Sequence, residues 1–219
     1  HMGKCAASTP AGATYATPSA SSKDVSGITA AGTYSYRLKN SYTGNGCDVG
    51  YSASSSITVN ADPAVGAPTV TNDPICQGGT TTISSTPSGG AGTQTLQWEY
   101  FDGSTWGNVG ANTPTGAAYA TPNASSTAIS SISASGTYSY RLKNSDTGNG
   151  CDVAYSTGKT ITVVDDPSIT TQPTNATICK GGSNTFSIIA ANGTPSLTYK
   201  WQYNNIGLRN LKIVNIKKY

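Results

Sequence analysis

The sequence predicts an all-β protein built from antiparallel β-sandwiches. Three observations carry this prediction. Apolar and polar residues alternate in short runs, Gly-rich and Asn-Gly turn signals separate those runs, and a unit of about 103 residues repeats along the chain. Only 11% of the residues are charged, against about 25% in an average domain. No apolar run reaches the length of a membrane span, so we expect none.

The repeat divides the chain. Residues 13–63 match residues 117–167 at 35 of 51 positions, and the segment Ile-Cys-Gln-Gly-Gly at 75–79 returns as Ile-Cys-Lys-Gly-Gly at 178–182. We therefore expect 3–62 to be the C-terminal half of one repeat, 63–166 to be a complete repeat, and 167–205 to be the N-terminal half of another. The chain is then a section of a longer tandem array.

Residues 206–219 break the pattern, because no Ser or Thr occurs from Lys200 onward. We interpret this tail as vector-derived or out-of-frame sequence, or as a divergent end of the protein. The tail carries four positive charges and no acid, whereas the formal net charge of the whole chain is +3. The residues before the tail therefore sum to −1. The four cations are Arg209, Lys212, Lys217 and Lys218. The repeats themselves are therefore not basic, and we expect no nucleic-acid partner.

Within the complete repeat, the apolar period of two predicts half-buried strands over 95–100, 138–143 and 160–163. Turn signals lie at 77–79, 88–90 and 146–150, and the Asn-Gly pair in the last suits a tight hairpin. About seven short strands in 100 residues are typical of a sandwich. We expect Trp98 to fill its centre, with Ile83, Tyr140 and Ile161 as neighbours.

The order of these features resembles a known family. The turn at 77–79, Trp98, the run at 136–140 and the strand at 160–163 are similar to the immunoglobulin-like (Ig-like) tandem repeats of large secreted and cell-surface adhesins of gliding bacteria. The resemblance implies an Ig-like sandwich and an extracellular or cell-surface location. It also makes Tyr138 the candidate tyrosine corner, whose hydroxyl bonds to backbone. Tyr140 stands where antibody-type domains carry their second core Cys, so the resemblance implies no cross-sheet disulfide of that kind.

Four of the five cysteines follow the repeat. Cys76 is equivalent to Cys179, and Cys47 to Cys151, whereas Cys5 aligns with a valine. Two pairings stay open. One is Cys76 with Cys151 inside the repeat, although Ig topology places these positions at opposite ends of the sandwich. The other joins neighbouring repeats, and between chains it predicts Cys47 linked to Cys179.

Catalytic chemistry has little material here, since Glu99 is the only Glu and His1 the only His. We therefore expect no enzyme, and no cofactor except calcium held between repeats by Asp165 and Asp166. The leading interpretation is a non-catalytic structural and adhesive module that provides reach and multivalent attachment to a surface glycan or protein. An inert spacer is a further alternative.

The main alternative is a carbohydrate-binding accessory domain of a secreted polysaccharide-degrading enzyme. Trp106 lies outside the regular alternation, so it either covers a sheet edge or forms a sugar-stacking platform with Tyr100 or Tyr119. The expected partners also include neighbouring repeats, because each half repeat leaves an apolar face and open strand edges. Two copies are then expected to complement each other head to tail.

Overall fold

The computed structural model describes residues 5, 8–17, 20–42, 44–203 and 212–213. Within these ranges every regular element is a strand and no helix occurs, which confirms the all-β prediction. The chain divides into two compact units, one formed by 1–67, 85–97 and 142–157, the other by 68–84, 98–141 and 158–219. Strands β12 (Gln94–Phe101) and β16 (Gly136–Asp146) run continuously through both.

Two sheets form within 63–166, and both are consistent with a sandwich. The first has the order β14-β15-β10-β8, with β14 at Ala118–Tyr119, β15 at Ser126–Ser130, β10 at Thr80–Ser84 and β8 at Thr69–Val70. β10 pairs antiparallel with both neighbours, and Thr80 lies opposite Ser130. Its Thr and Ile side chains are β-branched, which favours the extended backbone.

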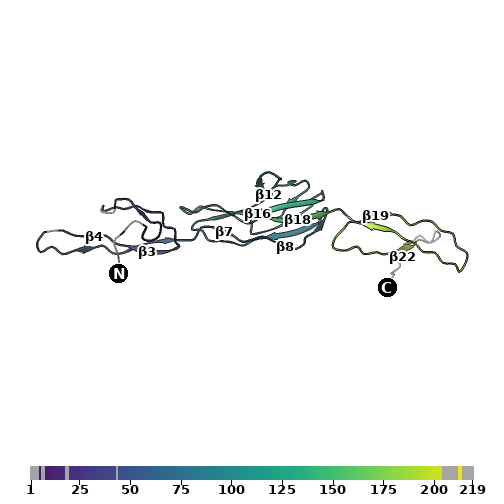
Figure 1. Cartoon of the computed structure of the whole chain (residues 1–219), viewed down its shortest axis with the longest axis horizontal. Helices are drawn as coiled ribbons and strands as arrows, with labels where there is room; N and C mark the ends of the chain where they lie inside the picture. Colours follow the sequence, from purple (N-terminus) through teal and green to yellow (C-terminus); the bar gives the residue numbers. More distant parts are fainter. Residues whose placement is uncertain (1–4, 6–7, 18–19, 43, 204–211, 214–219) are drawn as a thin grey trace. The chain divides into compact units, whose positions relative to one another are not determined.

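The second sheet has the order β13-β12-β16-β18-β9, and β17 (Ala154–Tyr155) pairs with β16 beside this path. β13 covers Trp106–Asn108, β18 covers Lys159–Val164 and β9 covers Ile75–Cys76. β16 is antiparallel to β18, whereas β9 is parallel to β18. In Figure 1, β12, β16 and β18 lie in one layer and β8 in the other. The segment from β8 to β9 therefore contributes to both sheets.

The remaining strands are short pairs. Inside the complete repeat, β7 (Ala64–Val65) pairs with β11 (Pro87–Ser88). The pairs before it are β1 (Thr14–Tyr15) with β2 (Val25–Ser26), β3 (Gly32–Tyr36) with β6 (Ser55–Val59), and β4 (Lys39–Asn40) with β5 (Gly50–Tyr51). The pairs after it are β19 (Ser168–Thr171) with β20 (Ile189–Ala191), and β21 (Gln202–Tyr203) with β22 (Lys212–Ile213).

The core belongs mainly to the complete repeat. Trp98, Tyr140 and Ile161, all expected there, have no exposed surface, and Tyr138 is half-buried. The other fully buried large side chains include Ile83, Ile129, Ile132, Leu142 and Val163. Most of these residues come from strands that alternate inward and outward positions, which is why the period of two located them in the sequence.

The turn at 77–79 shows why its sequence requires glycine. Gly78 has φ +71°, a left-handed conformation that side chains rarely adopt, and its N–H donates to the Ile132 carbonyl at 2.9 Å. A Cβ at Gly79 would lie 2.8 Å from the Cys76 carbonyl oxygen. The two glycines thus let β9 turn sharply into β10.

Candidate functional site

The inner face of the second sheet holds a cluster of tyrosines beside Trp98. Tyr100 lies 6.3 Å from Tyr138 and 5.6 Å from Tyr140 between ring centroids, and Tyr119 lies 6.2 Å from Tyr140. The Tyr119 hydroxyl donates to the Thr113 carbonyl at 2.8 Å. The hydroxyl oxygens of Tyr119 and Tyr140 are 3.3 Å apart. These offset and edge-on contacts are those that aromatic cores favour.

Burial favours the neutral form of Tyr100, Tyr119 and Tyr140 in this cluster. Desolvation raises the pKa of Tyr119 to about 12, and it also raises the pKa values of Tyr140 and Tyr100 above the ordinary range. A phenol with a raised pKa stays protonated at neutral pH and does not act as a general base. The cluster therefore serves packing, and Trp98 joins it to the fold by donating its Nε1–H to the Ala124 carbonyl at 2.9 Å.

Tyr138 has the hydrogen bond expected of a tyrosine corner. Its hydroxyl donates to the Ala134 carbonyl, four residues upstream, at 2.9 Å. In the first half repeat, Tyr34 makes the equivalent bond to the Ala30 carbonyl, also at 2.9 Å. The motif is therefore a local device that forms in the half repeat as well as in the complete one.

The opposite face of the second sheet carries a small polar and aromatic cluster, which we call the Trp106 face: Glu99, Phe101, Trp106 and Arg141. Arg141 Nε donates to Glu99 Oε2 at 2.7 Å, and the Arg141 guanidinium lies 4.6 Å from the Trp106 ring centroid. Phe101 is opposite Trp106 in the β12–β13 pair, and their ring centroids are 5.2 Å apart.

The Trp106 face differs from the predicted platform. Tyr100 alternates with Glu99 and Phe101 along β12, so it faces the core, and Tyr119 joins it there. The structure therefore does not bring Tyr100 and Tyr119 together with Trp106. Trp106 instead lies half-buried at the edge strand, where a Cβ on Gly158 would be 3.3 Å from its ring. Trp106 therefore covers the sheet edge, which is the first of its two expected roles. Because the ring is partly exposed, it is also accessible to a ligand.

The Glu99–Arg141 pair was not predicted from the sequence, because alternation places each residue on a face of its strand but does not show which charged side chains of neighbouring strands meet. The Glu99 side chain is only 7% exposed and that of Arg141 is 22% exposed. One feature of the sequence could have indicated the pair. Glu99 is the only Glu, and it lies on the outward face of its predicted strand, as Arg141 does on the strand at 138–143. A charged pair shielded by two aromatic rings interacts more strongly than an exposed one.

Chemically, this face offers three kinds of contact for a sugar. The Trp106 ring provides an apolar surface for stacking, the guanidinium provides N–H donors, and the carboxylate accepts hydrogen bonds. Asp102 shapes the neighbouring turn by accepting the N–H groups of Ser104 and Thr105, both at 2.8 Å. These backbone hydrogen bonds lower the pKa of Asp102.

The cysteines are all free thiols in the structure. Cys76 lies in β9, which pairs with β18, and Cys151 follows β16. No bond joins Cys76 to Cys151 in the structure, and the choice between a pairing within the repeat and one between repeats stays a prediction.

Asp165, one of the two predicted calcium ligands, accepts a hydrogen bond from Gln77 Nε2 at 3.3 Å. Within the described part of the chain, the Asp166 carboxylate makes no such hydrogen bond, and no three His, Cys, Asp or Glu side chains lie close enough together to hold a metal ion. The calcium expectation therefore stays a prediction.

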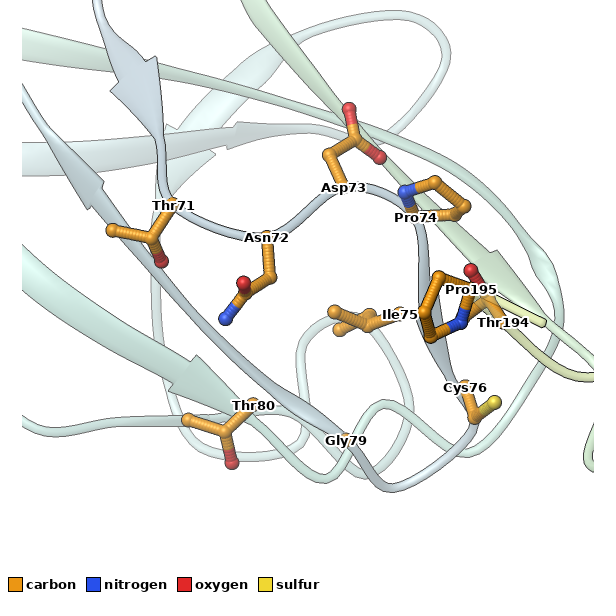
Figure 2. Close-up of a pocket in the computed structure, with 10 residues that line it drawn as sticks. All are labelled: Thr71, Asn72, Asp73, Pro74, Ile75, Cys76, Gly79, Thr80, Thr194 and Pro195. Atoms are coloured by element: carbon orange, nitrogen blue, oxygen red, sulfur yellow. The ribbon is translucent and has the colours of Figure 1, made fainter. Parts of the chain in front are cut away.

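A hollow of about 450 Å³ lies beside β9, lined by residues 71–76, 79–80 and 194–195. Figure 2 shows Cys76 and Asp73 among the residues around it. Asp73 Oδ1 already accepts the Thr162 N–H at 2.8 Å, so its carboxylate holds the β18 backbone. The lining supplies hydroxyl, amide, carboxylate, thiol and proline groups.

No protein-family model matches this chain, and no curated protein matches it. The described part of the chain contains no helix that is long and apolar enough to cross a membrane.

Proposed function

We propose that the chain is a section of tandem Ig-like repeats with a structural and adhesive role outside the cell or at its surface, and without catalytic activity. The strand order supports the Ig-like assignment. Lettered in chain order, β8, β10, β14 and β15 correspond to strands A, B, D and E, and the first sheet places them side by side as A-B-E-D. The second sheet contains β12, β16 and β18, which correspond to C, F and G, as in Ig sandwiches.

The observation that carries this proposal is the repetition of one sandwich-forming unit with a similar linker at each boundary. Asp62-Pro63 precedes the complete repeat and Asp166-Pro167 follows it, at an offset of 104. Such units add length in proportion to their number, and repeated weak contacts increase attachment strength.

Single-molecule extension of the whole chain tests the structural role. Unfolding of 63–166 should release one contour-length step of roughly 35 nm, because an extended residue spans at most about 3.6 Å. The half repeats should extend without a comparable force peak. A chain that extends smoothly throughout would contradict the structural proposal.

Attachment is tested separately, by measuring retention of the chain on immobilised polysaccharides and on whole cells. A chain with several copies of 63–166 in tandem should bind more tightly than the single copy by an avidity factor. Binding that does not increase with copy number would contradict the adhesive role and favour an inert spacer.

Carbohydrate binding at the Trp106 face is the second candidate function, favoured by the partly exposed ring next to Arg141. Trp106→Ala should reduce retention on a polysaccharide gel by about fivefold or more, since an aromatic side chain stacked on a ring-shaped ligand such as a nucleic-acid base contributes about 1–3 kcal/mol. The matched control is Tyr42→Ala, which removes a ring that is 75% exposed outside the complete repeat. Equal retention of both variants would exclude this face.

A further inference from the structure

Three asparagines in this chain are followed directly by glycine, and their surroundings differ. Asn45-Gly46 and Asn149-Gly150 are repeat equivalents, whereas Asn192-Gly193 occupies a different place in the repeat. An asparagine before glycine is open to deamidation, because no side chain on the glycine shields the backbone nitrogen that attacks the asparagine amide. Whether this attack occurs in the folded chain depends on what surrounds that nitrogen.

The first two pairs lie in open turns, and all four of their residues are exposed. A Cβ built on Gly46 or on Gly150 would meet no atom within 4 Å outside its own neighbours in the chain. Within the described residues, neither glycine N–H donates a hydrogen bond. The attacking nitrogen is therefore accessible in both turns, and it is not engaged elsewhere.

The third pair is closed. The Gly193 N–H donates to the Asp165 carbonyl at 3.0 Å, so its nitrogen is already engaged. A Cβ on Gly193 would lie 2.7 Å from Pro167 Cγ and 3.3 Å from Leu197 Cδ2, because these side chains cover the glycine. Gly193 is accordingly half-buried, although Asn192 is exposed. The same dipeptide therefore occurs in two different environments within one chain.

We propose that Asn149 and its equivalent Asn45 are sites of spontaneous deamidation, and that the fold protects Asn192 from the same reaction. The new carboxyl group, whose ordinary pKa is about 3.9, is ionised at neutral pH. Because the open turn recurs with the repeat, each repeat that carries it gains one negative charge as the protein ages. This inference goes beyond the proposed function and does not depend on it.

The reaction needs only water. The Gly150 backbone nitrogen forms a bond to Asn149 Cγ, the bond from Cγ to Nδ2 breaks, and the proton of the Gly150 N–H leaves with Nδ2 as ammonia. The product is a cyclic imide, which water opens at either carbonyl to give aspartate or isoaspartate. In sum, one asparagine and one water become one acid and one ammonia, without oxidation or reduction.

In the complete repeat, hydrogen bonds hold the turn that would be modified. The Cys151 N–H donates to the Gly148 carbonyl at 3.1 Å, which closes the turn around Asn149 and Gly150. The Gly148 N–H donates to Asp146 Oδ1 at 2.5 Å, so one carboxylate already lies at this turn. Isoaspartate adds one carbon to the main chain between these contacts. Deamidation therefore changes both the length and the charge of the turn.

Peptide mapping by mass spectrometry of the whole folded chain tests the proposal. The chain is kept at mildly alkaline pH in water enriched in heavy oxygen, so that every carboxyl group formed during the incubation carries a label. Labelling at Asn45 and Asn149 should be at least about fivefold faster than at Asn192, the ratio that one net backbone hydrogen bond provides. Labelling of Asn192 as fast as that of Asn149 would overturn the proposal.

The same incubation in concentrated urea is the matched control. Unfolding removes the hydrogen bond and the packing around Gly193, so Asn192 should then be labelled about as fast as Asn149. A ratio that is unchanged in urea would show that the fold does not protect Asn192. A second control is Asn149→Gln, whose longer side chain closes a larger ring more slowly. This variant should lose the label at position 149 and keep it at Asn45, and a label that persists at 149 would contradict the imide route.

Discussion

The complete repeat and the first half repeat have nearly the same sequence over 51 positions and yet differ in burial. Leu142 has no exposed surface, whereas the equivalent Leu38 is 47% exposed. β16 extends over 11 residues, but its equivalent is divided into β3 of 5 residues and β4 of 2 residues. Among the described residues, β3 and β6 pair only with each other, whereas β16 and β18 belong to the larger sheet, so burial of these equivalent residues follows sheet assembly.

Local structure, in contrast, is the same in both regions. Tyr15 and Tyr36 are 6.3 Å apart with rings inclined at 69°, and their equivalents Tyr119 and Tyr140 are 6.2 Å apart at 66°. The Leu38 N–H donates to Ser52 Oγ at 2.9 Å, as the Leu142 N–H donates to Ser156 Oγ at 2.8 Å. Turn chemistry and short-range hydrogen bonds therefore form without the sandwich, while the apolar burial that stabilises it does not.

The sharpest test of this difference is the central tryptophan. Trp98→Ala should destabilise the complete repeat by about 3–5 kcal/mol, because it leaves a cavity and an unpaired Ala124 carbonyl. Trp201→Ala, at the equivalent position in the second half repeat, should change the free energy of unfolding by less than about 0.5 kcal/mol. Urea unfolding of the monomer measures both. Similar losses at the two positions would show that the half repeat already has a core.

A smaller side chain provides a matched pair in the other half. Ile161→Ala should cost about 2–4 kcal/mol, since Ile161 is fully buried in β18. Ile57→Ala should cost less than about 0.5 kcal/mol, because Ile57 is 40% exposed. The measurement is urea unfolding of both variants. An equal loss of free energy of unfolding at the two positions would show that Ile57 also packs in a core.

The Glu99–Arg141 ion pair is a polar contact that occurs in the complete repeat and has no equivalent in the first half repeat. Arg141→Ala should destabilise the repeat by about 1–2 kcal/mol, because it leaves the nearly buried Glu99 carboxylate without its partner. The expected loss is kept below that of a fully buried pair because Arg141 is partly exposed and solvent screens its charge. Arg37→Ala is the control, since the equivalent Arg37 lies 4.2 Å from the Tyr51 ring centroid and its region contains no Glu. Thermal unfolding of both variants gives the comparison, which fails if the control loses as much.

Features that depend on neighbouring residues along the chain, or on the alternation of apolar and polar residues, could be predicted from the sequence. It located Trp98, Tyr140 and Ile161 and the turn at 77–79, because alternation and glycine have direct physical meanings. It did not separate Tyr100 and Tyr119 from Trp106, since the face on which a residue lies depends on strand register. It also left the cysteine pairing open, because the distance between Cys76 and Cys151 depends on how β9, β18 and β16 align.

The smallest expected effect concerns acid pH. The Asp146 carboxylate accepts the Gly92 N–H at 2.9 Å and the Gly148 N–H, and these hydrogen bonds lower its pKa. A carboxyl whose pKa is lowered by folding stabilises the fold above its unfolded value of about 3.9, and this contribution is lost as pH falls through the folded pKa. The melting temperature should therefore drop slightly between about pH 5 and pH 2.

Asp146→Asn should flatten that drop, because the amide does not titrate but keeps an oxygen acceptor. The first half repeat has Tyr42 at the equivalent position, so Tyr42→Phe is a control that should leave the pH profile unchanged. An equally steep profile for Asp146→Asn would assign the acid sensitivity to other carboxylates, such as Asp102.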